Sequence, residues 1–373
     1  MRNTKPLVLP RWLHRIFYAL IVATLACRPA QSQHQHSASE FDVFLAAEGV
    51  AGHGQPNPRE DDTWLSADVV FGLTHDQFRV FGEYFITSEE HDLERFQVGY
   101  EFVPDTVLWL GRFHQPASAW DTEHHHGRYL QTAITRPAIE NWEDEDGLIP
   151  QHITGALVES RWPILTEAGV QLAAGAGVGP ALTSDDNEPF SIFGGNSGRH
   201  GAALMGRLGF MPDYGGTSSV GLLFGHDQLF ATSQVAMSAL RSTHVVLSIY
   251  GAYADWTVDE WRFIATGYYV DVGLDRPTPD ESFASAYLQL ERHLPHQLTA
   301  FTRVEDSPRM QHSRYVNQLD ARSPDIDIAI RRQTGGLRWD YAPSQALTIE
   351  LGHEIALTQR GTEVRLQWSA VVP

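Results

Sequence analysis

Histidine, carboxylate and arginine side chains are concentrated in and beside residues 113–150. Imidazole nitrogens and carboxylate oxygens bind divalent metal ions, whereas arginines beside carboxylates set the charge of a channel. This stretch therefore has side chains suited to metal binding or to ion selection. The candidate residues are Arg112, His114, Trp120, Asp121, Glu123, His124, His125, His126, Arg128 and Arg136.

The run of three histidines suggests a metal site. Successive side chains of an extended backbone point to opposite sides, so His124 and His126 are the pair that can share one metal ion. His114 and His152 lie close to this run in the sequence. We therefore keep a divalent metal as an alternative ligand and expect no other cofactor.

Catalytic motifs are absent from the sequence. It has no Gly-x-Ser-x-Gly elbow, no His-Glu-x-x-His helix and no phosphate-binding loop. We therefore expect that the protein is not an enzyme.

Composition limits the class of protein. The chain has 373 residues, 27 Lys plus Arg against 46 Asp plus Glu, a net charge of −19 and a mean hydropathy of −0.26. This acidic balance excludes a basic nucleic-acid-binding protein, and the 42% hydrophobic content excludes a disordered chain. Neither feature distinguishes one large β domain from two smaller domains.

Residues 1–32 have the pattern of a signal peptide. Basic residues precede an apolar run at 16–26, and Ala30 and Ser32 form a small-x-small cleavage site. Lipoprotein processing at Cys27 is the alternative. The apolar run is shorter than the ~20 residues of a membrane-spanning helix, so we expect export and cleavage before Gln33.

Residues 33–373 alternate between apolar and polar positions in short segments. The last segment has one apolar face, at Val364, Leu366, Trp368, Ala370 and Val372, and one polar face, at Glu363, Arg365, Gln367 and Ser369. Such segments, repeated about sixteen times, are typical of a transmembrane antiparallel up-and-down β-barrel. We expect all-β architecture in one domain.

The connections between these segments alternate between short and long. Short ones lie near 74–77, 103–105, 163–167, 211–216, 255–259, 294–297 and 342–345. Outer-membrane barrels have short periplasmic turns and long outer loops, so both termini are expected on the periplasmic side. The stretch 113–150 is then the third outer loop, and in general porins the third loop folds into the barrel and narrows it. If this loop bends inward, its charged groups would set the charge and width of the constriction.

The polar faces of the strands would line a wet lumen. We expect inward arginines of the wall to face inward carboxylates and to create a transverse field, the residues being Asp68, Arg79, Glu83, Arg95, Glu101, Glu350 and Arg365. The apolar faces would contact lipid, and we place Val107, Trp109 and Phe113 among them.

One part of the loop region resembles a known group of proteins. Gly111-Arg112-Phe113-His114-Gln115-Pro116, Trp120, His125-His126-Gly127, Tyr129-Leu130-Gln131-Thr132, Arg136-Pro137 and Gly147-Leu148-Ile149-Pro150-Gln151-His152 resemble porin-like outer-membrane proteins of Gram-negative bacteria. The resemblance implies location and class, not a ligand. The chain departs from the barrel pattern by ending Val371-Val372-Pro373, since an aromatic residue usually stands last. Either Trp368 suffices for the barrel-assembly machinery, or assembly differs.

These patterns together predict an outer-membrane porin. We expect passive diffusion of small hydrophilic solutes or ions with a mild cation preference, outer-membrane lipids around the barrel, and a homotrimer as a possible assembly. The alternative is a barrel that binds a metal ion or metal complex through its His-rich third loop.

Overall fold

The computed structural model describes residues 37–53, 63–87, 91–124, 128–140, 148–164, 166–182, 187–196, 198–231, 243–275, 278–320 and 328–372. The expected signal peptide, residues 1–32, lies outside the described residues, as do His125 and His126. Among the residues described, no helix has both the length and the apolar character needed to cross a membrane.

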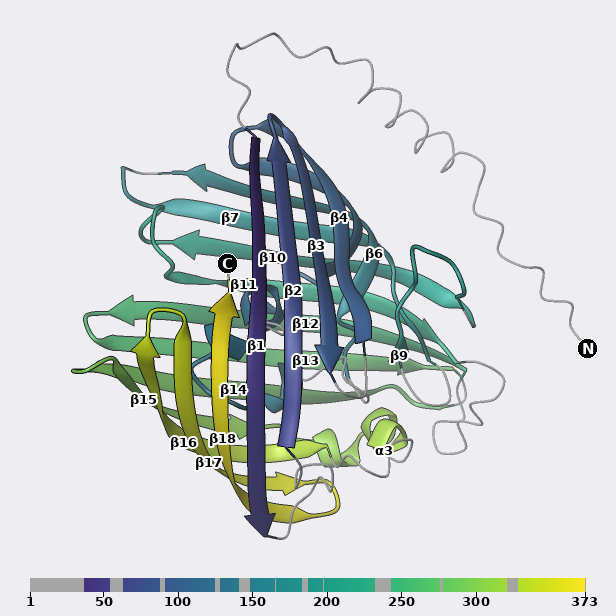
Figure 1. Cartoon of the computed structure of the whole chain (residues 1–373). Helices are drawn as coiled ribbons and strands as arrows, with labels where there is room; N and C mark the ends of the chain where they lie inside the picture. The colour runs from purple at the N-terminus through teal and green to yellow at the C-terminus, as the bar shows by residue number, and fades with distance from the viewer. Residues whose placement is uncertain are drawn as a thin grey trace, which may run out of the picture. The chain divides into compact units, whose positions relative to one another are not determined.

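Sixteen antiparallel strands form one closed barrel, which confirms the expected fold class. β1 pairs with β2 on one side and with the last strand, β18, on the other (Figure 1). The barrel strands are β1 (Ser37–His53), β2 (Thr63–His75), β3 (Phe78–Thr87), β4 (His91–Val103), β5 (Thr106–His114), β6 (His152–Pro163), β7 (Gly169–Val178), β10 (His200–Met211), β11 (Ser219–Phe230), β12 (His244–Val258), β13 (Trp261–Leu274), β14 (Glu281–Leu294), β15 (Leu298–Asp306), β16 (Ala329–Ala342), β17 (Gln345–Ala356) and β18 (Arg360–Val372).

Short turns join the strands at one end of the barrel, as the sequence predicted. Three of them contain an aspartate with positive φ, at Asp76 (53°), Asp105 (60°) and Asp259 (51°). Tight hairpin turns require positive φ, and aspartate tolerates this conformation better than most residues. β1 begins and β18 ends at this short-turn end, and the longer connections lie at the other, long-loop end.

The strand faces follow the expected alternation over most of the barrel. On β18, the outward Leu366 is 57% exposed, whereas the neighbouring Gln367 is 3% exposed. Outward leucines of other strands, such as Leu65 and Leu222, are similarly exposed. The barrel therefore presents an apolar outer surface and holds its polar strand residues inside.

The prediction for β5 was wrong. Val107 lines an internal cavity with Glu101, and Phe113 is 1% exposed within the apolar core. Trp109 is on the same side, since strand side chains alternate, and its indole N–H donates to Glu159 of that cavity at 2.8 Å. Leu108 and Leu110 take the outward positions instead. An apolar set of residues faces inward here because the long loop packs against it.

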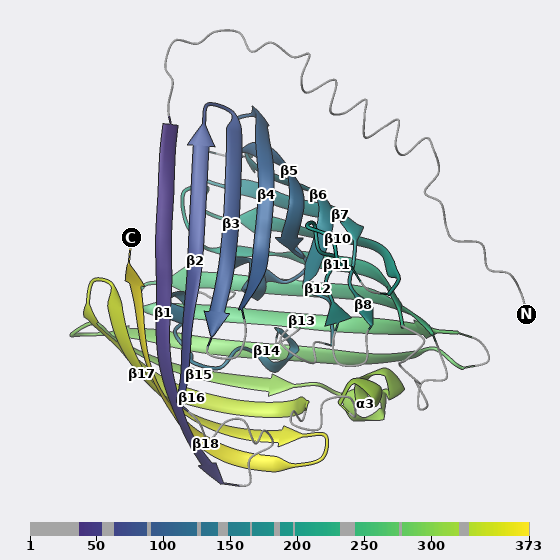
Figure 2. The same ribbon diagram turned by 45° about the vertical axis from the view of Figure 1, so that its right-hand side comes forward.

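The connections at the long-loop end carry the remaining elements. The β5–β6 loop contains α2 (Ala119–His124), η2 (Arg128–Leu130) and η3 (Ala138–Glu140); β8 (Ala181–Leu182) and β9 (Asn187–Glu188) pair between β7 and β10. η4 (Met310–His312) and α3 (Arg314–Asp320) follow β15 (Figure 2). The α3 residue Tyr315 is fully buried and its hydroxyl donates to the carbonyl oxygen of Leu148 at 2.8 Å, which joins the two loops.

Candidate functional site

The β5–β6 loop lies inside the barrel and is bound to the inner wall. Its residues Ala117, Ile134 and Ile149 are at most 1% exposed, although the loop joins two neighbouring strands. A loop of this length that projected into solvent would leave such side chains exposed. Two kinds of contact hold it there, one polar and one apolar.

The first anchor consists of Glu350 on β17 and Arg303 on β15. The Glu350 carboxylate accepts from the Ile134 N–H at 2.8 Å and from the Thr135 hydroxyl at 2.7 Å. The Arg303 guanidinium donates to the carbonyl oxygens of Thr135 at 2.8 Å and Arg136 at 3.0 Å. Because both side chains are almost fully buried, charge-assisted hydrogen bonds fix this loop segment to the wall.

Neighbouring strands extend this polar anchor along the loop. Arg338 on β16 donates to the Tyr129 carbonyl oxygen at 2.7 Å and also to that of Gln131. The Ala138 N–H donates to the Glu305 carboxylate of β15 at 2.6 Å. The backbone of residues 129–138 is thereby held by β15, β16 and β17.

The second anchor is an apolar core on the other side of the loop. Trp120 and Ile139 of the loop pack in one buried cluster with inward side chains of β12, β13 and β14, such as Leu247, Val270 and Phe283. Burial of apolar surface stabilises this contact by roughly 1.5–3 kcal/mol for each large side chain. The inner wall is apolar here, whereas the sequence predicted a wet lumen lined by the polar faces of the strands.

Glu140 is a carboxyl group buried at this apolar side. It accepts hydrogen bonds from the Ser118 hydroxyl at 2.7 Å and the Tyr268 hydroxyl at 2.8 Å. Burial raises the pKa of Glu140 to about 7, and the nearby Glu305 also raises it, while hydrogen bonds from the hydroxyls of Ser118, Tyr268 and Tyr287 oppose the shift. The group therefore changes charge near neutral pH.

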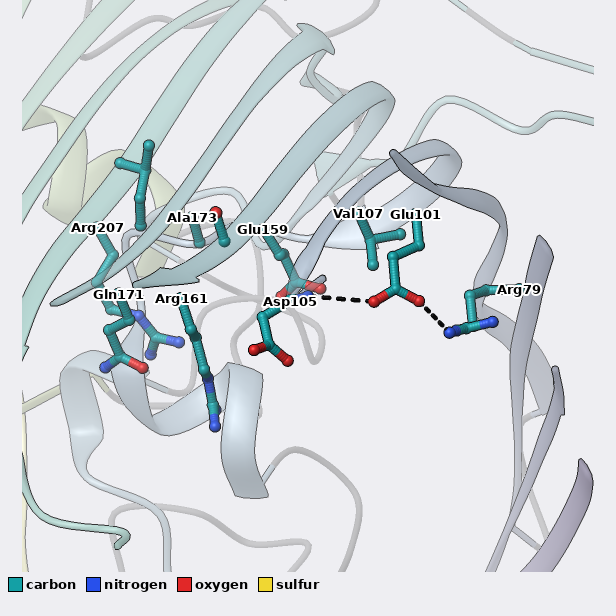
Figure 3. A pocket seen from close by; sticks show the side chains of 11 residues that line it. Arg79, Glu101, Asp105, Val107, Glu159, Arg161, Gln171, Ala173 and Arg207 are labelled. Atoms are coloured by element: carbon teal, nitrogen blue, oxygen red, sulfur yellow. Dashed lines mark hydrogen bonds and ion pairs between the residues drawn. The ribbon is translucent and has the colours of Figure 1, made fainter. Parts of the chain in front are cut away.

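A polar cavity of about 330 Å³ is lined by residues of β3 to β7 and β10, toward the short-turn end (Figure 3). It is lined by three arginines and three carboxylates, namely Arg79, Arg161, Arg207, Glu101, Asp105 and Glu159. Arg79 forms an ion pair with Glu101, whose carboxylate also accepts from the Asp105 N–H at 3.1 Å. Arg207 reaches the loop, where it donates to the Thr122 hydroxyl at 2.9 Å.

The structure separates the predicted lining residues into three groups. Arg79 and Glu101 line the cavity, whereas Glu350 anchors the loop. The other predicted wall residues contact neighbours within the wall. Glu83 forms an ion pair with Arg95, and Arg112 forms one with Asp92 at 3.0 Å. Arg365 pairs with Glu48 at 2.9 Å and with Glu363 at 2.8 Å, and Asp68 is buried diagonally from Glu83 on the adjacent strand.

Of the predicted loop residues, His114, Trp120 and Arg136 are buried. The side chains of Asp121, Glu123 and Arg128 lie outside the described part of the structure. Whether these residues line a pore stays a prediction.

Sequence reasoning missed the anchor residues Arg303, Glu305 and Arg338 and the cavity residues Arg161 and Arg207. All of them lie on strands, and the alternation that selected Arg79 and Glu350 would also have admitted them. The apolar inner wall had a signal too: β12 and β13 have apolar residues on both faces, as a strand packed on two sides requires.

His124 has a packed and apolar environment. Its ring lies 4.9 Å from that of Trp120, between centroids, and burial, with Arg262 nearby, lowers its pKa to about 4. His126 lies outside the described residues, so their joint metal site stays a prediction. Among the described residues, one set of side chains brings its potential ligand atoms close enough to hold a metal ion, namely Glu94, His114 and His152.

The closed antiparallel barrel of sixteen strands, with its long loop folded inward, is a porin-like fold. No family model and no curated protein sequence matches the chain. Solved porin structures are similar in fold. An anion-selective porin from Comamonas acidovorans aligns with a TM-score of 0.59 and 10% identity, over 90% of this chain and 100% of that one.

Two further solved structures are similar to this chain in fold. In-vitro-folded OmpT, an outer membrane protein of Vibrio cholerae, aligns with a TM-score of 0.56 and 10% identity, over 92% of this chain and 100% of that one. Salmonella typhi OmpF, in complex with daunomycin, aligns with a TM-score of 0.54 and 8% identity, over 89% and 97%. At these identities the likeness establishes the porin fold of this chain.

Proposed function

We propose that the protein is an outer-membrane porin, a passive diffusion channel for small hydrophilic solutes or ions with a mild cation preference. The observation that carries this proposal is the internal loop: it is anchored to the wall on two sides, and its residue Thr122 contacts Arg207, one of the arginines that line a polar cavity together with carboxylates. Such a loop sets the width and charge of a passage without any catalytic step. We accordingly propose no enzymatic role.

The cation preference rests on charge. The chain has a net charge of −19, although the inner carboxylates Glu48, Glu83 and Glu305 are each paired with an arginine. A surplus of negative charge raises the local concentration of cations. The cavity itself is nearly balanced, so the preference is expected to be mild.

Planar-bilayer recording of the purified, refolded protein tests the channel. We expect stable conductance steps and, in a KCl gradient, a reversal potential of the sign that marks cation selectivity. Inserted protein without conductance would refute the open channel, and a potential of opposite sign would refute the cation preference. Light scattering in detergent measures the number of subunits separately, and a homotrimer would give three times the mass of one chain.

Two neighbouring cavity residues allow a matched test of ion selection. Glu159 and Arg161 lie two residues apart on β6 and line the same cavity. We expect Glu159→Gln to lower the K⁺ over Cl⁻ permeability ratio and Arg161→Gln to raise it. A unit charge at 4 Å in water is worth about 1 kcal/mol, so each change should be at most about fivefold.

The measurement is the reversal potential of both variants at 0.1 M and 1 M KCl, because salt screens exposed charges. Shifts of opposite sign that shrink at high salt are expected. Shifts of the same sign in the two variants would show that these side chains do not select ions by their charge.

A further inference from the structure

Two histidines and a glutamate converge where the internal loop leaves and re-enters the barrel wall. His114 is the last residue of β5, His152 is the first of β6, and Glu94 belongs to the adjacent strand β4. One ligand atom from each lies within 4.8 Å of the others. All three residues are at most 5% exposed. Two imidazoles and one carboxylate form a donor set that binds zinc and similar metals.

The strand geometry explains why the three meet. His114 and His152 are paired in register across β5 and β6, and their ring centroids are 4.8 Å apart. On β4 the pairing with β3 skips Glu94, since Glu83 opposes Arg95 and Tyr84 opposes Leu93. Glu94 is therefore the extra residue of a β-bulge, a feature that redirects a side chain. Its carboxylate lies 3.4 Å from His152 Nε2.

A built-in cation also contacts this group. The Arg112 guanidinium lies 3.2 Å from His152 Nδ1 and donates to Asp92 at 3.0 Å through the same nitrogen, Nη2. A metal ion on Nε2 leaves the ring proton on Nδ1, facing Arg112. Metal binding therefore requires Arg112 to withdraw from the ring, and Asp92 already offers it a partner.

We propose that Glu94, His114 and His152 form a site for a divalent metal ion of the Zn²⁺, Ni²⁺ and Cu²⁺ class, and that the bound ion ties both ends of the internal loop to β4. Three protein ligands leave a position for water. Because the carboxylate and the imidazoles are borderline to hard donors, these ions are favoured over soft thiolate-seeking ones. This site is distinct from the His124–His126 run and does not depend on whether the barrel conducts.

Metal titration of the refolded, chelator-stripped protein tests the proposal. We expect one equivalent of Zn²⁺ to bind by calorimetry, and His114→Ala and His152→Ala each to weaken binding by more than the roughly 10–100-fold caused by losing a residue that merely orients a ligand. Glu94→Gln should weaken it at least 10-fold. His244→Ala, a histidine near Asp275 at the same end of the barrel, is the matched control and should bind as wild type does.

The Arg112→Gln variant separates metal binding from simple packing. The glutamine carbonyl can accept the Nδ1 proton that the guanidinium opposes, so Zn²⁺ affinity should rise about 10-fold, within the range seen for residues that orient a ligand. A purely structural role of Arg112 would not increase affinity. Lower or unchanged affinity in this variant would contradict the assigned ring geometry.

Spectroscopy of the wild-type protein keeps the test decisive if a variant does not fold. With one equivalent of Cu²⁺, electron paramagnetic resonance should report two imidazole nitrogens, and the same spectrum should persist when His124, His125 and His126 are replaced by alanine. Loss of the signal in that triple variant, or unchanged Zn²⁺ affinity after His114→Ala and His152→Ala, would overturn the proposal.

Discussion

Replacement of Glu350 by alanine is expected to release residues 134–135 from the barrel wall and to increase the single-channel conductance severalfold. The Glu350 carboxylate accepts from the Ile134 N–H and the Thr135 hydroxyl in a buried setting. Its removal leaves those two buried donors without their charged acceptor, while Arg303 keeps its ion pair with Glu305 at 2.8 Å. Breaking a buried charged interaction of this kind costs about 3–5 kcal/mol. Conductance in a planar bilayer and the urea concentration at half unfolding are the two measurements.

A double-mutant cycle with Thr135→Val assigns the effect to the anchor itself. If Glu350 acts through Thr135, the changes in the free energy of unfolding caused by the two substitutions should differ from additivity by about 0.5–3 kcal/mol. Amide hydrogen exchange of Ile134 and Thr135 should accelerate in Glu350→Ala while strands far from the loop keep their protection. Unchanged exchange at these two amides would show that the loop stays in place without Glu350.

The second large effect concerns pH. Glu140 is fully buried, and its pKa is raised to about 7, whereas an unfolded glutamate titrates near 4.3. The contribution of Glu140 to stability is therefore complete below about pH 4.3 and is lost as pH rises through about 7. The shift corresponds to a weakening of the loop anchor by about 4 kcal/mol between those limits.

Denaturant unfolding of wild type and Glu140→Gln from pH 4 to 8 measures this contribution. The glutamine cannot ionise, so the variant should not lose this stability as pH rises. The free energy of unfolding of wild type should therefore fall relative to that of Glu140→Gln between pH 4 and 8, because all other groups titrate alike in the two proteins. Tyr268→Phe is a second informative variant, because it removes a hydroxyl donor that lowers the pKa of Glu140. The free energy of unfolding should then depend more strongly on pH. Parallel pH curves for wild type and Glu140→Gln would contradict the prediction.

The position of the loop could be anticipated better than its contacts. Its length and its order as the third long connection marked it as functional but left its direction open. Glu350 was predicted to line the lumen, and its carboxylate contacts the loop. However, the partners of Glu350 lie more than 200 residues earlier in the chain. No local pattern specifies such a pairing, because it depends on which strand faces the loop across the lumen.

The β5 strand illustrates a different limit. Val107, Trp109 and Phe113 looked like a lipid-facing set, yet they face inward, and Leu108 and Leu110 point outward. Both faces of this strand are apolar, so alternation alone could not orient it. The choice follows from the loop and the neighbouring inner wall, which supply an apolar surface on the inside as well.

The sequence by itself determined the barrel: period-two alternation, aspartates in tight turns and the order of short and long connections specify strands, their number and the end at which the chain starts and stops. Those are local properties, each set by a few adjacent residues. Only the tertiary structure decided what fills the barrel. Closure of the sheet brings β12–β17 opposite the loop, and the register of β4, β5 and β6 with a bulge at Glu94 places Glu94 beside His114 and His152. The anchor and the proposed metal site therefore arise from contacts between strands that no single stretch of sequence contains.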